Sequence, residues 1–247
     1  MSAMPRQALV LAAGLGTRMR PLTQDCPKPL LPVGGKPLID HMLDRLLEGG
    51  VEDAVVNVHH LAEKMEAHLA RRHAPRLRIS DERARLLETG GALKKARPML
   101  GEGPIFIGNT DSVWQGGGPA ALALARAWDP ARMDVLLLVV PLEHTLGFDG
   151  PGDFFPAGEG ILRFRNEAAS APLAYMGLHI TKPQIVDAME EESFSLARIW
   201  RRLAQEGRLH ACVFDGFWMH VGDPAALAAA HEHLIRPRAL GPGPPRA

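Results

Sequence analysis

The sequence predicts an α/β fold, a Rossmann-like three-layer αβα sandwich around a mostly parallel sheet. Short apolar runs alternate with amphipathic stretches through the first half of the chain, which is the pattern of repeated βαβ units. Residues 135–141 are apolar throughout, as expected for a strand that is covered on both faces. Gly14 and Gly16 directly follow the first apolar run, at the strand end where such sheets bind ligands.

The elements follow from local signals along the chain. Pro37 stands where a helix can begin, and the pair Gly49-Gly50 ends the helical spacing of apolar residues. The Gly- and Pro-rich stretch 142–180 is expected to form loops and shorter strands. The main strands are expected at residues 7–13, 54–58, 104–108, 135–141 and 174–180. The helices are expected at residues 37–48, 62–72, 90–97, 119–128, 195–206 and 224–233.

Composition narrows the class of function. The chain has 28 basic and 28 acidic residues, so no overall field attracts nucleic acid or a membrane surface, and neither is expected as a partner. Phosphate binding must then be local. The two cysteines, Cys26 and Cys212, lie far apart and form no metal-ligand spacing. The polar N-terminus lacks a secretory pattern, and the longest apolar run is too short to span a bilayer. We expect a cytoplasmic enzyme.

The loop after the first strand has features of a phosphate-binding site. Its glycines let backbone N–H groups approach an anion closely. A dinucleotide fingerprint is excluded because Met19 stands where its third glycine would be, and a Walker loop is excluded because Pro37 follows the Gly35-Lys36 pair. Arg18 lies in the loop, and Lys28 follows it between two prolines that fix its backbone. Fixed positive charge beside a glycine loop suits a nucleoside triphosphate.

Residues 11–23, 27–30 and 32–39 together resemble the start of the sugar-nucleotide pyrophosphorylase family. The resemblance implies the nucleotide-diphospho-sugar transferase fold and transfer of a nucleotidyl group from a nucleoside triphosphate to a sugar 1-phosphate. It implies that Arg18 contacts the leaving pyrophosphate and that Lys28 contacts the phosphates being joined. It also implies nucleotide contacts from the loop, at Leu11, Ala12, Ala13, Gly14, Gly16 and Thr17.

The same resemblance implies one domain over residues 1–236. Residues 1–141 would be its nucleotide-binding half and residues 142–236 its sugar-binding half. The tail, residues 237–247, holds four prolines and two glycines, and it is expected to be disordered.

A second segment is expected to contact the base. A Thr-Gly-Gly run that opens a helix can offer backbone donors and acceptors to a flat base edge, although the residues alone also fit an ordinary helix start. The family places nucleotide contacts here, which assigns this role to Glu88, Thr89, Gly90 and Gly91. Their sequence resembles the branch of the family that uses UTP and N-acetylmuramate 1-phosphate.

A metal site is expected at the end of the strand at 104–108. Asp111 matches the aspartate by which family members bind Mg²⁺, an ion that neutralises phosphate charge. The family's second aspartate is absent, because His220 stands at its position. Imidazole suits Mg²⁺ less well than a carboxylate does, so Mn²⁺ binding or direct phosphate contact are the alternatives. Asp223 precedes Pro224 and is expected to cap the last helix.

Asp153 and Gly177 are the candidate sugar contacts. They fall where the family keeps its acceptor pocket, and Gly177 would allow the backbone to approach a hexose closely. Asn57, at the end of the second strand, and His59, just after it, are weaker candidates. A lone histidine at such a place is more often a surface or packing residue.

The resemblance implies uridylyl transfer from UTP to N-acetylmuramate 1-phosphate in cell-wall sugar recycling, with Mg²⁺ or Mn²⁺ as cofactor. The alternatives within the family are mannose-1-phosphate guanylyltransferase and glucose-1-phosphate thymidylyl- or uridylyltransferase. A catalytically silent subunit that binds sugar nucleotides is the alternative of another class, because His220 replaces an acid. The oligomeric state does not follow from the sequence.

Overall fold

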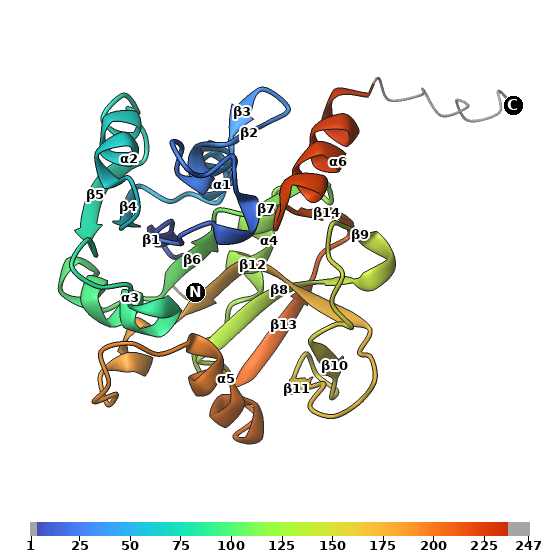
Figure 1. Ribbon diagram of the computed structural model, residues 1–247. Helices are drawn as coiled ribbons and strands as arrows, with labels where there is room; N and C mark the ends of the chain where they lie inside the picture. The colour runs from blue at the N-terminus through green and yellow to red at the C-terminus, as the bar shows by residue number, and fades with distance from the viewer. Residues whose placement is uncertain (1–3, 237–247) are drawn as a thin grey trace, which may run out of the picture.

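A nine-stranded sheet forms the centre of the molecule (Figure 1). The computed structural model of the chain describes residues 4–236. The strands of this sheet are β1 (Gln7–Leu11), β4 (Asp53–Val58), β5 (Arg76–Asp81), β6 (Ile105–Asn109), β8 (Val135–Pro141), β10 (Phe154–Pro156), β11 (Leu162–Phe164), β12 (Leu173–Thr181) and β13 (Leu209–Val213). Seven of them lie in the order β11-β10-β12-β6-β1-β4-β5, while β8 pairs with β12 and β13 pairs with β8.

The sheet is parallel from β6 through β1 and β4 to β5, and mixed beyond β6. β1 runs parallel to both β4 and β6, β4 runs parallel to β5, and β8 runs parallel to β13. β12 is antiparallel to β6 and β8, and its pairing with β8 is irregular between Tyr175 and His179. Strands of both expected halves of the chain therefore share one sheet.

Helices cover both faces of the sheet, as the three-layer prediction requires. The α-helices within residues 4–236 are α1 (Leu38–Glu48), α2 (Ala62–Leu69), α3 (Glu88–Ala96), α4 (Ala120–Ala127), α5 (Leu196–Gln205) and α6 (Pro224–Ile235). One core cluster joins apolar side chains of α1, α2 and α4 to one face of the sheet. A second cluster joins α3 and α5 to the opposite face (Figure 1). Because successive strand residues point to opposite faces, the apolar strands β1 and β8 contribute to both clusters. The predicted fold class is confirmed.

A smaller sheet lies beside the carboxyl ends of the main strands. It consists of β7 (Ser112–Gly116), β14 (Gly216–His220) and β9 (Thr145–Leu146), while β2 (Pro32–Val33) pairs with β3 (Lys36–Pro37). The register sets His220 opposite Ser112, the residue after Asp111. A third core cluster joins these strands to α6 and to the turn at Met19. The 3₁₀ helices are η1 (Thr17–Met19), η2 (Lys28–Leu30), η3 (Arg97–Met99), η4 (Leu142–His144) and η5 (Pro183–Val186).

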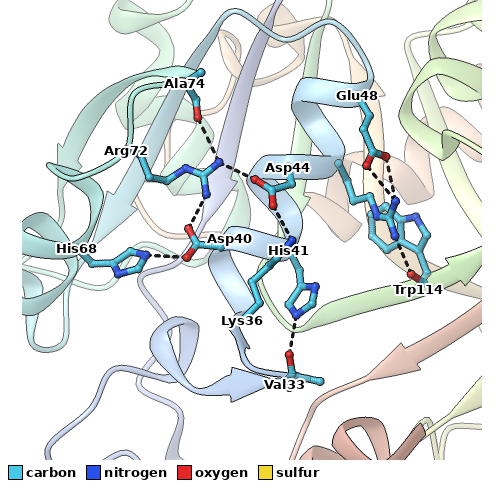
Figure 2. Close-up of polar contacts among 11 residues, drawn as sticks. Val33, Lys36, Asp40, His41, Asp44, Glu48, His68, Arg72, Ala74 and Trp114 are labelled. Carbon is cyan, nitrogen blue, oxygen red and sulfur yellow. Dashed lines mark hydrogen bonds and ion pairs between the residues drawn. The ribbon is translucent and has the colours of Figure 1, made fainter. Parts of the chain in front are cut away.

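Ion pairs fasten α1 to the end of α2 (Figure 2). Arg72 donates to Asp40 and to Asp44, each at 2.7 Å. His68 Nε2 lies 2.9 Å from Asp40 Oδ2, and Lys36 donates to Asp44 at 2.7 Å. Burial alone would raise the pKa of Asp44, but the hydrogen bonds from Lys36 and Arg72 lower it. The network holds α1 in place behind the Lys28 segment.

The structure confirms each of the six predicted helices, with ends shifted by a few residues. Asp223 caps α6, since its side chain accepts a hydrogen bond from the N–H of Ala226 at 2.9 Å. The strands β5, β7, β13 and β14 were not predicted. β5 is an edge strand whose outward residues are charged, so it lacks an apolar signal.

Three further observations concern the cysteines, membrane-spanning helices and the tail. Both cysteines are free thiols. Over residues 4–236 no helix is long and apolar enough to cross a membrane. The predicted disordered tail, residues 237–247, lies outside the described residues.

Candidate active site

A cavity of about 350 Å³ opens at the carboxyl ends of β1, β4 and β6. This is the sheet edge at which the glycine loop was expected to bind a ligand. The cavity wall contains both basic candidates, Arg18 and Lys28, and the metal candidate Asp111. The other lining residues are Leu11, Ala12, Ala13, Gly14, Gly16, Thr17, Pro29, Asn57, Glu82, Leu86, Glu88, Thr89, Asn109 and Thr110.

The glycine loop is shaped by contacts on its closed side. Gly16 has φ of 61°, and a Cβ there would lie 3.0 Å from side-chain atoms of both Lys28 and Thr23. Thr23 donates its hydroxyl to the Gly16 carbonyl at 2.8 Å. A Cβ on Gly14 would meet nothing within 4 Å. Gly16 therefore fixes the turn, whereas Gly14 leaves open space in the cavity for a ligand.

A buried amide anchors the start of this loop. Asn57 Oδ1 accepts hydrogen bonds from the N–H of Ala12 at 2.6 Å and of Ala13 at 3.2 Å. Its Nδ2 donates to Glu82 Oε1 at 2.9 Å. Asn57 is 3% exposed and Glu82 is 1% exposed. Burial raises the pKa of Glu82, which the hydrogen bond from Asn57 partly offsets. These contacts tie β1, β4 and the end of β5 together beneath the loop.

Lys28, Asp111 and His220 converge at the other side of the cavity. Lys28 Nζ donates to Asp111 Oδ2 at 2.9 Å, and His220 Nε2 lies 3.7 Å from the same oxygen. The Asp111 carbonyl accepts a hydrogen bond from the N–H of Val221 at 2.8 Å, which joins the strand carrying His220 to this aspartate. Burial would raise the pKa of Asp111, but His220 and Lys28 together hold it well below its usual range. Asp111 is therefore ionised at neutral pH.

Arg18 is exposed and lies close to His220 across Gly222. A Cβ built on Gly222 would come within 2.8 Å of the His220 ring and 3.4 Å of Arg18 Nη1. The absence of a side chain at Gly222 thus leaves room for both groups. Lys28 thus lies beside Asp111 and Arg18 lies near His220, and two positive charges in this arrangement suit a polyanion with a divalent ion.

Asp111 and His220 are the residues that could hold such an ion. His220 Nε2 lies 3.7 Å from Asp111 Oδ2, so the two side chains face one another and would hold the ion between them. Among residues 4–236, no three His, Cys, Asp or Glu side chains form a metal cluster. The remaining ligands would then come from substrate phosphates and water, as is usual for Mg²⁺. A carboxylate and an imidazole fit an ion of this kind, and the imidazole makes Mn²⁺ an acceptable alternative.

The predicted base segment is only partly in the cavity wall. Glu88 and Thr89 line the cavity at the start of α3, with Glu88 at a φ of 59°. Gly90 and Gly91 lie behind it, and their N–H groups both donate to the Phe194 carbonyl, at 2.8 and 3.2 Å. A Cβ on Gly90 would come within 2.2 Å of the Phe194 ring. The structure thus gives these two glycines a packing role.

The predicted sugar residues lie at the bulge in β12, outside the main cavity wall. Asp153 Oδ2 accepts a hydrogen bond from the N–H of Tyr175 at 2.9 Å, and burial raises the pKa of Asp153. Gly177 has φ of 80°, and a Cβ there would lie 3.0 Å from the Cβ of Asn109. Asp153 fixes the strand, and Gly177 allows it to pass close to Asn109. Sugar contact by either residue remains a prediction.

Comparisons with known proteins show the family of the chain. The family model for nucleotidyl transferases matches residues 7–236. The chain belongs to the nucleotidyl transferase family. It is 53% identical over 239 residues to the N-acetylmuramate alpha-1-phosphate uridylyltransferase of Caulobacter vibrioides, which covers 95% of this chain and 99% of the relative. The protein of the same name from Neisseria meningitidis is 34% identical over 227 residues, with 91% and 96% covered.

Solved structures of nucleotidyl transferases share the fold. The UDP-glucose pyrophosphorylase from Acinetobacter baumanii superposes with a TM-score of 0.78 at 17% identity, covering 93% of each chain. The inositol-1-phosphate CTP transferase from T. maritima gives a TM-score of 0.76 at 18% identity, covering 94% of this chain and 98% of that one. The predicted enzyme class, sugar-1-phosphate nucleotidyltransferase, is confirmed at the level of the family.

The roles of Asn57 and Glu82 beneath the glycine loop were not predicted from the sequence. Asn57 was a minor candidate, and Glu82 was not a candidate at all. The only local signal for Asn57 is a polar residue inside an otherwise apolar strand. A residue of this kind in a buried strand must find a partner, so its position at the carboxyl end of β4 could have indicated a role near the loop.

Proposed function

We propose that this nucleotidyl transferase moves a uridylyl group from UTP to N-acetylmuramate 1-phosphate and releases pyrophosphate. The observation that carries the proposal is the convergence of Lys28 and His220 on Asp111, with Arg18 beside them, at one end of the cavity. The choice of UTP and of this acceptor is supported by the relatives from Caulobacter vibrioides and Neisseria meningitidis. The relatives described as mannose-1-phosphate guanylyltransferases are more distant, at 28–29% identity.

In the proposed reaction, an oxygen of the sugar phosphate attacks the α-phosphorus of UTP in line with the departing pyrophosphate. Two polyanions must meet, so catalysis depends on alignment and on fixed positive charge. Lys28, held at 2.9 Å from Asp111, would contact the attacking phosphate and the α-phosphate. Arg18 would bind the leaving pyrophosphate. The open space at Gly14 would admit the triphosphate to the loop.

Mg²⁺ is the proposed cofactor, held by Asp111 and His220. When bound, the ion supplies positive charge that offsets the charge of the phosphates. Lys28 would then share Asp111 with the ion. Because Asp111 is ionised at neutral pH, it needs no deprotonation before the ion binds. We place the reaction in the cytoplasm, where nucleoside triphosphates are made.

The nucleotide would lie over β1, β4 and β5, and the sugar phosphate over β6 and β12. Asn57, Glu82, Glu88 and Thr89 line the first part of the cavity, and Asn109 lies between the two parts. Gly14, Gly16, Thr17 and the backbone of residues 11–13 would contact the nucleotide. Asp153 and Gly177, at the bulge of β12, would lie on the sugar side. This division follows the strand order β12-β6-β1-β4-β5.

A pyrophosphate-release assay tests the proposal. The four ribonucleoside triphosphates are each combined with N-acetylmuramate, N-acetylglucosamine, mannose and glucose 1-phosphates, first with Mg²⁺ and then with Mn²⁺. The expected result is the highest kcat/KM for UTP with N-acetylmuramate 1-phosphate. Preference for GTP with mannose 1-phosphate would contradict it. Binding of UTP without turnover of any pair would favour a silent sugar-nucleotide-binding subunit, the function that His220 in place of a carboxylate would also fit.

A further inference from the structure

A second, smaller cavity of about 150 Å³ lies behind the first, and we name it the inner pocket. Three residues, Leu11, Thr89 and Asn109, line both cavities, so the two are neighbours. The other residues that line the inner pocket are Tyr175, His179, Ser195, Leu196, Ala197 and Trp200. They come from β12 and from the start of α5, which is the sugar side of the sheet. One water molecule occupies about 30 Å³, so the pocket has room for a group of a few heavy atoms.

The inner pocket contains hydrogen-bond donors that lack partners. His179 Nε2 and Trp200 Nε1 are both buried and have no hydrogen-bond partner among the described residues. The two side chains are 1% and 8% exposed. A buried donor of this kind usually has a partner, because leaving it unpaired is unfavourable. These two belong to residues that line one small cavity, where a ligand oxygen or a water molecule can pair with them.

The contact between Tyr175 and His179 favours the tautomer in which His179 Nε2 is a donor. Burial lowers the pKa of His179 to about 3, so the ring is neutral at physiological pH. Tyr175 lies with its hydroxyl 2.6 Å from His179 Nδ1, and burial raises the pKa of this hydroxyl, which therefore keeps its proton. When the hydroxyl donates to Nδ1, the single ring proton must be on Nε2. Both unpaired atoms are then N–H groups that require an acceptor.

The first turn of α5 adds to the same polarity. This helix has ten residues, and its N-terminal N–H groups give the pocket wall a partial positive charge. Ser195 caps the N–H of Ala197 at 3.3 Å, and Thr89 Oγ1 accepts from the N–H of Leu196 at 2.9 Å. These first-turn N–H groups are already paired, so the donors that remain for a ligand oxygen are the two side chains.

The surroundings favour a neutral oxygen over a charged one. None of the nine lining residues is lysine or arginine, and His179 is neutral. The ionised groups that act on Tyr175 are both acids, Asp111 and Asp153. A carboxylate in this place would lose its hydration without gaining a cation, which is costly, whereas an amide carbonyl needs only hydrogen bonds.

We propose that the inner pocket binds the carbonyl of an acetamido group on the sugar 1-phosphate, with Trp200 Nε1 and His179 Nε2 as donors. The enzyme would then select N-acetylated amino-sugar 1-phosphates over plain hexose 1-phosphates. This inference rests on the proposed function, which places the sugar phosphate over β6 and β12. It adds a structural reason for the acceptor class that does not depend on the relatives.

The test uses Trp200→Phe, which removes the N–H group and keeps an aromatic ring. Trp128→Phe is a matched control, because Trp128 is also buried, at 4% exposure, and its Nε1 has no partner within the described part of the chain. Trp128 lies in the core on the opposite face of the sheet. The kcat/KM with UTP is measured for N-acetylmuramate, N-acetylglucosamine and glucose 1-phosphates. Trp200→Phe should lower the preference for both acetylated acceptors over glucose 1-phosphate by about tenfold, the effect of one hydrogen bond. Trp128→Phe should leave this preference as in the wild type.

Other results would overturn the inference. An equal loss for all three acceptors in Trp200→Phe would give Trp200 a packing role only. A loss confined to N-acetylmuramate 1-phosphate would assign the pocket to its lactyl carboxylate. Calorimetric binding of the three sugar phosphates to the wild type separates this inference from the proposed reaction, because it needs no turnover. If glucose 1-phosphate bound as tightly as the acetylated acceptors, the inference would fail even where UTP turnover was as proposed.

Discussion

Removing the side chain of Asn57 is expected to destabilise the protein and to disturb the glycine loop. Asn57→Ala deletes the acceptor for the N–H groups of Ala12 and Ala13 and the donor to Glu82. A buried polar group left without a partner costs about 1–3 kcal/mol. Ala12 and Ala13 border the cavity, so water can accept hydrogen bonds from their N–H groups and recover part of the lost stability. The expected loss in the free energy of unfolding is therefore about 2–4 kcal/mol, below the sum for three groups.

Urea unfolding measures this loss, and steady-state kinetics measures its effect on the site. Because Asn57 fixes the backbone of Ala12 and Ala13, the variant should show a raised KM for UTP. A loss below about 1 kcal/mol, combined with an unchanged KM, would refute the idea that this amide holds the loop in place.

Asn57→Asp tests the contact with Glu82 separately from the contact with the loop. It keeps the acceptor for the loop but places a second carboxyl group against Glu82, where the present distance is 2.9 Å. Burial already raises the pKa of Glu82, and two adjacent carboxyls raise it further by sharing one proton. Above about pH 4 the folded variant then binds more protons than the unfolded chain. The stabilising effect of the shared proton is therefore present in acid and is lost as the pH rises through the raised pKa of the carboxyl pair.

The difference in stability between the wild type and Asn57→Asp should therefore be smaller at about pH 5 than at about pH 8. The gap between these two differences should be about 1.4 kcal/mol for each unit by which the pKa is raised. Urea unfolding at the two pH values provides the comparison. An equal difference at both would show that the Asn57–Glu82 contact does not carry the effect.

Three further predictions concern the charged groups. Arg18→Ala and Lys28→Ala should each lower kcat about 100-fold or more with the circular dichroism spectrum unchanged, and normal pyrophosphate release by either would contradict their roles. His220→Asp restores a carboxylate beside Asp111, so the ratio of Mg²⁺-supported to Mn²⁺-supported turnover should rise; an unchanged ratio would place His220 outside the metal site. Hydrogen bonds from Arg208 and Lys182 lower the pKa of Asp134 to about 2. Its contribution to stability is present above about pH 4 and is lost as the pH falls toward 2, so Asp134→Asn should cost about 1–2 kcal/mol at neutral pH and little in acid, as urea unfolding at both would show.

Local sequence was sufficient for the elements whose signal lies within a few residues. The glycine loop, the prolines around Lys28 and the helix starts depend on backbone preferences of single residues, and the structure places Gly14, Arg18 and Lys28 on one cavity as expected. Asp223 is another case, because an N-cap contacts a residue three positions away. The strands β7 and β14 gave no such signal, since each is defined by its pairing with the other.

Tertiary structure decided which distant residues meet. Lys28 and Asp111 lie 83 positions apart, and their contact depends on the parallel pairing of β1 with β6. The Gly90-Gly91 pair looks like a base-binding turn in sequence, yet the chain at Phe194 occupies its N–H groups. Strand order and helix packing are set by the whole core, so no local pattern encodes such contacts. The sequence by itself determined the glycine loop with its two basic residues. The fold alone determined Asn57 beneath that loop, His220 beside Asp111 and the donors of the inner pocket that are unpaired within residues 4–236.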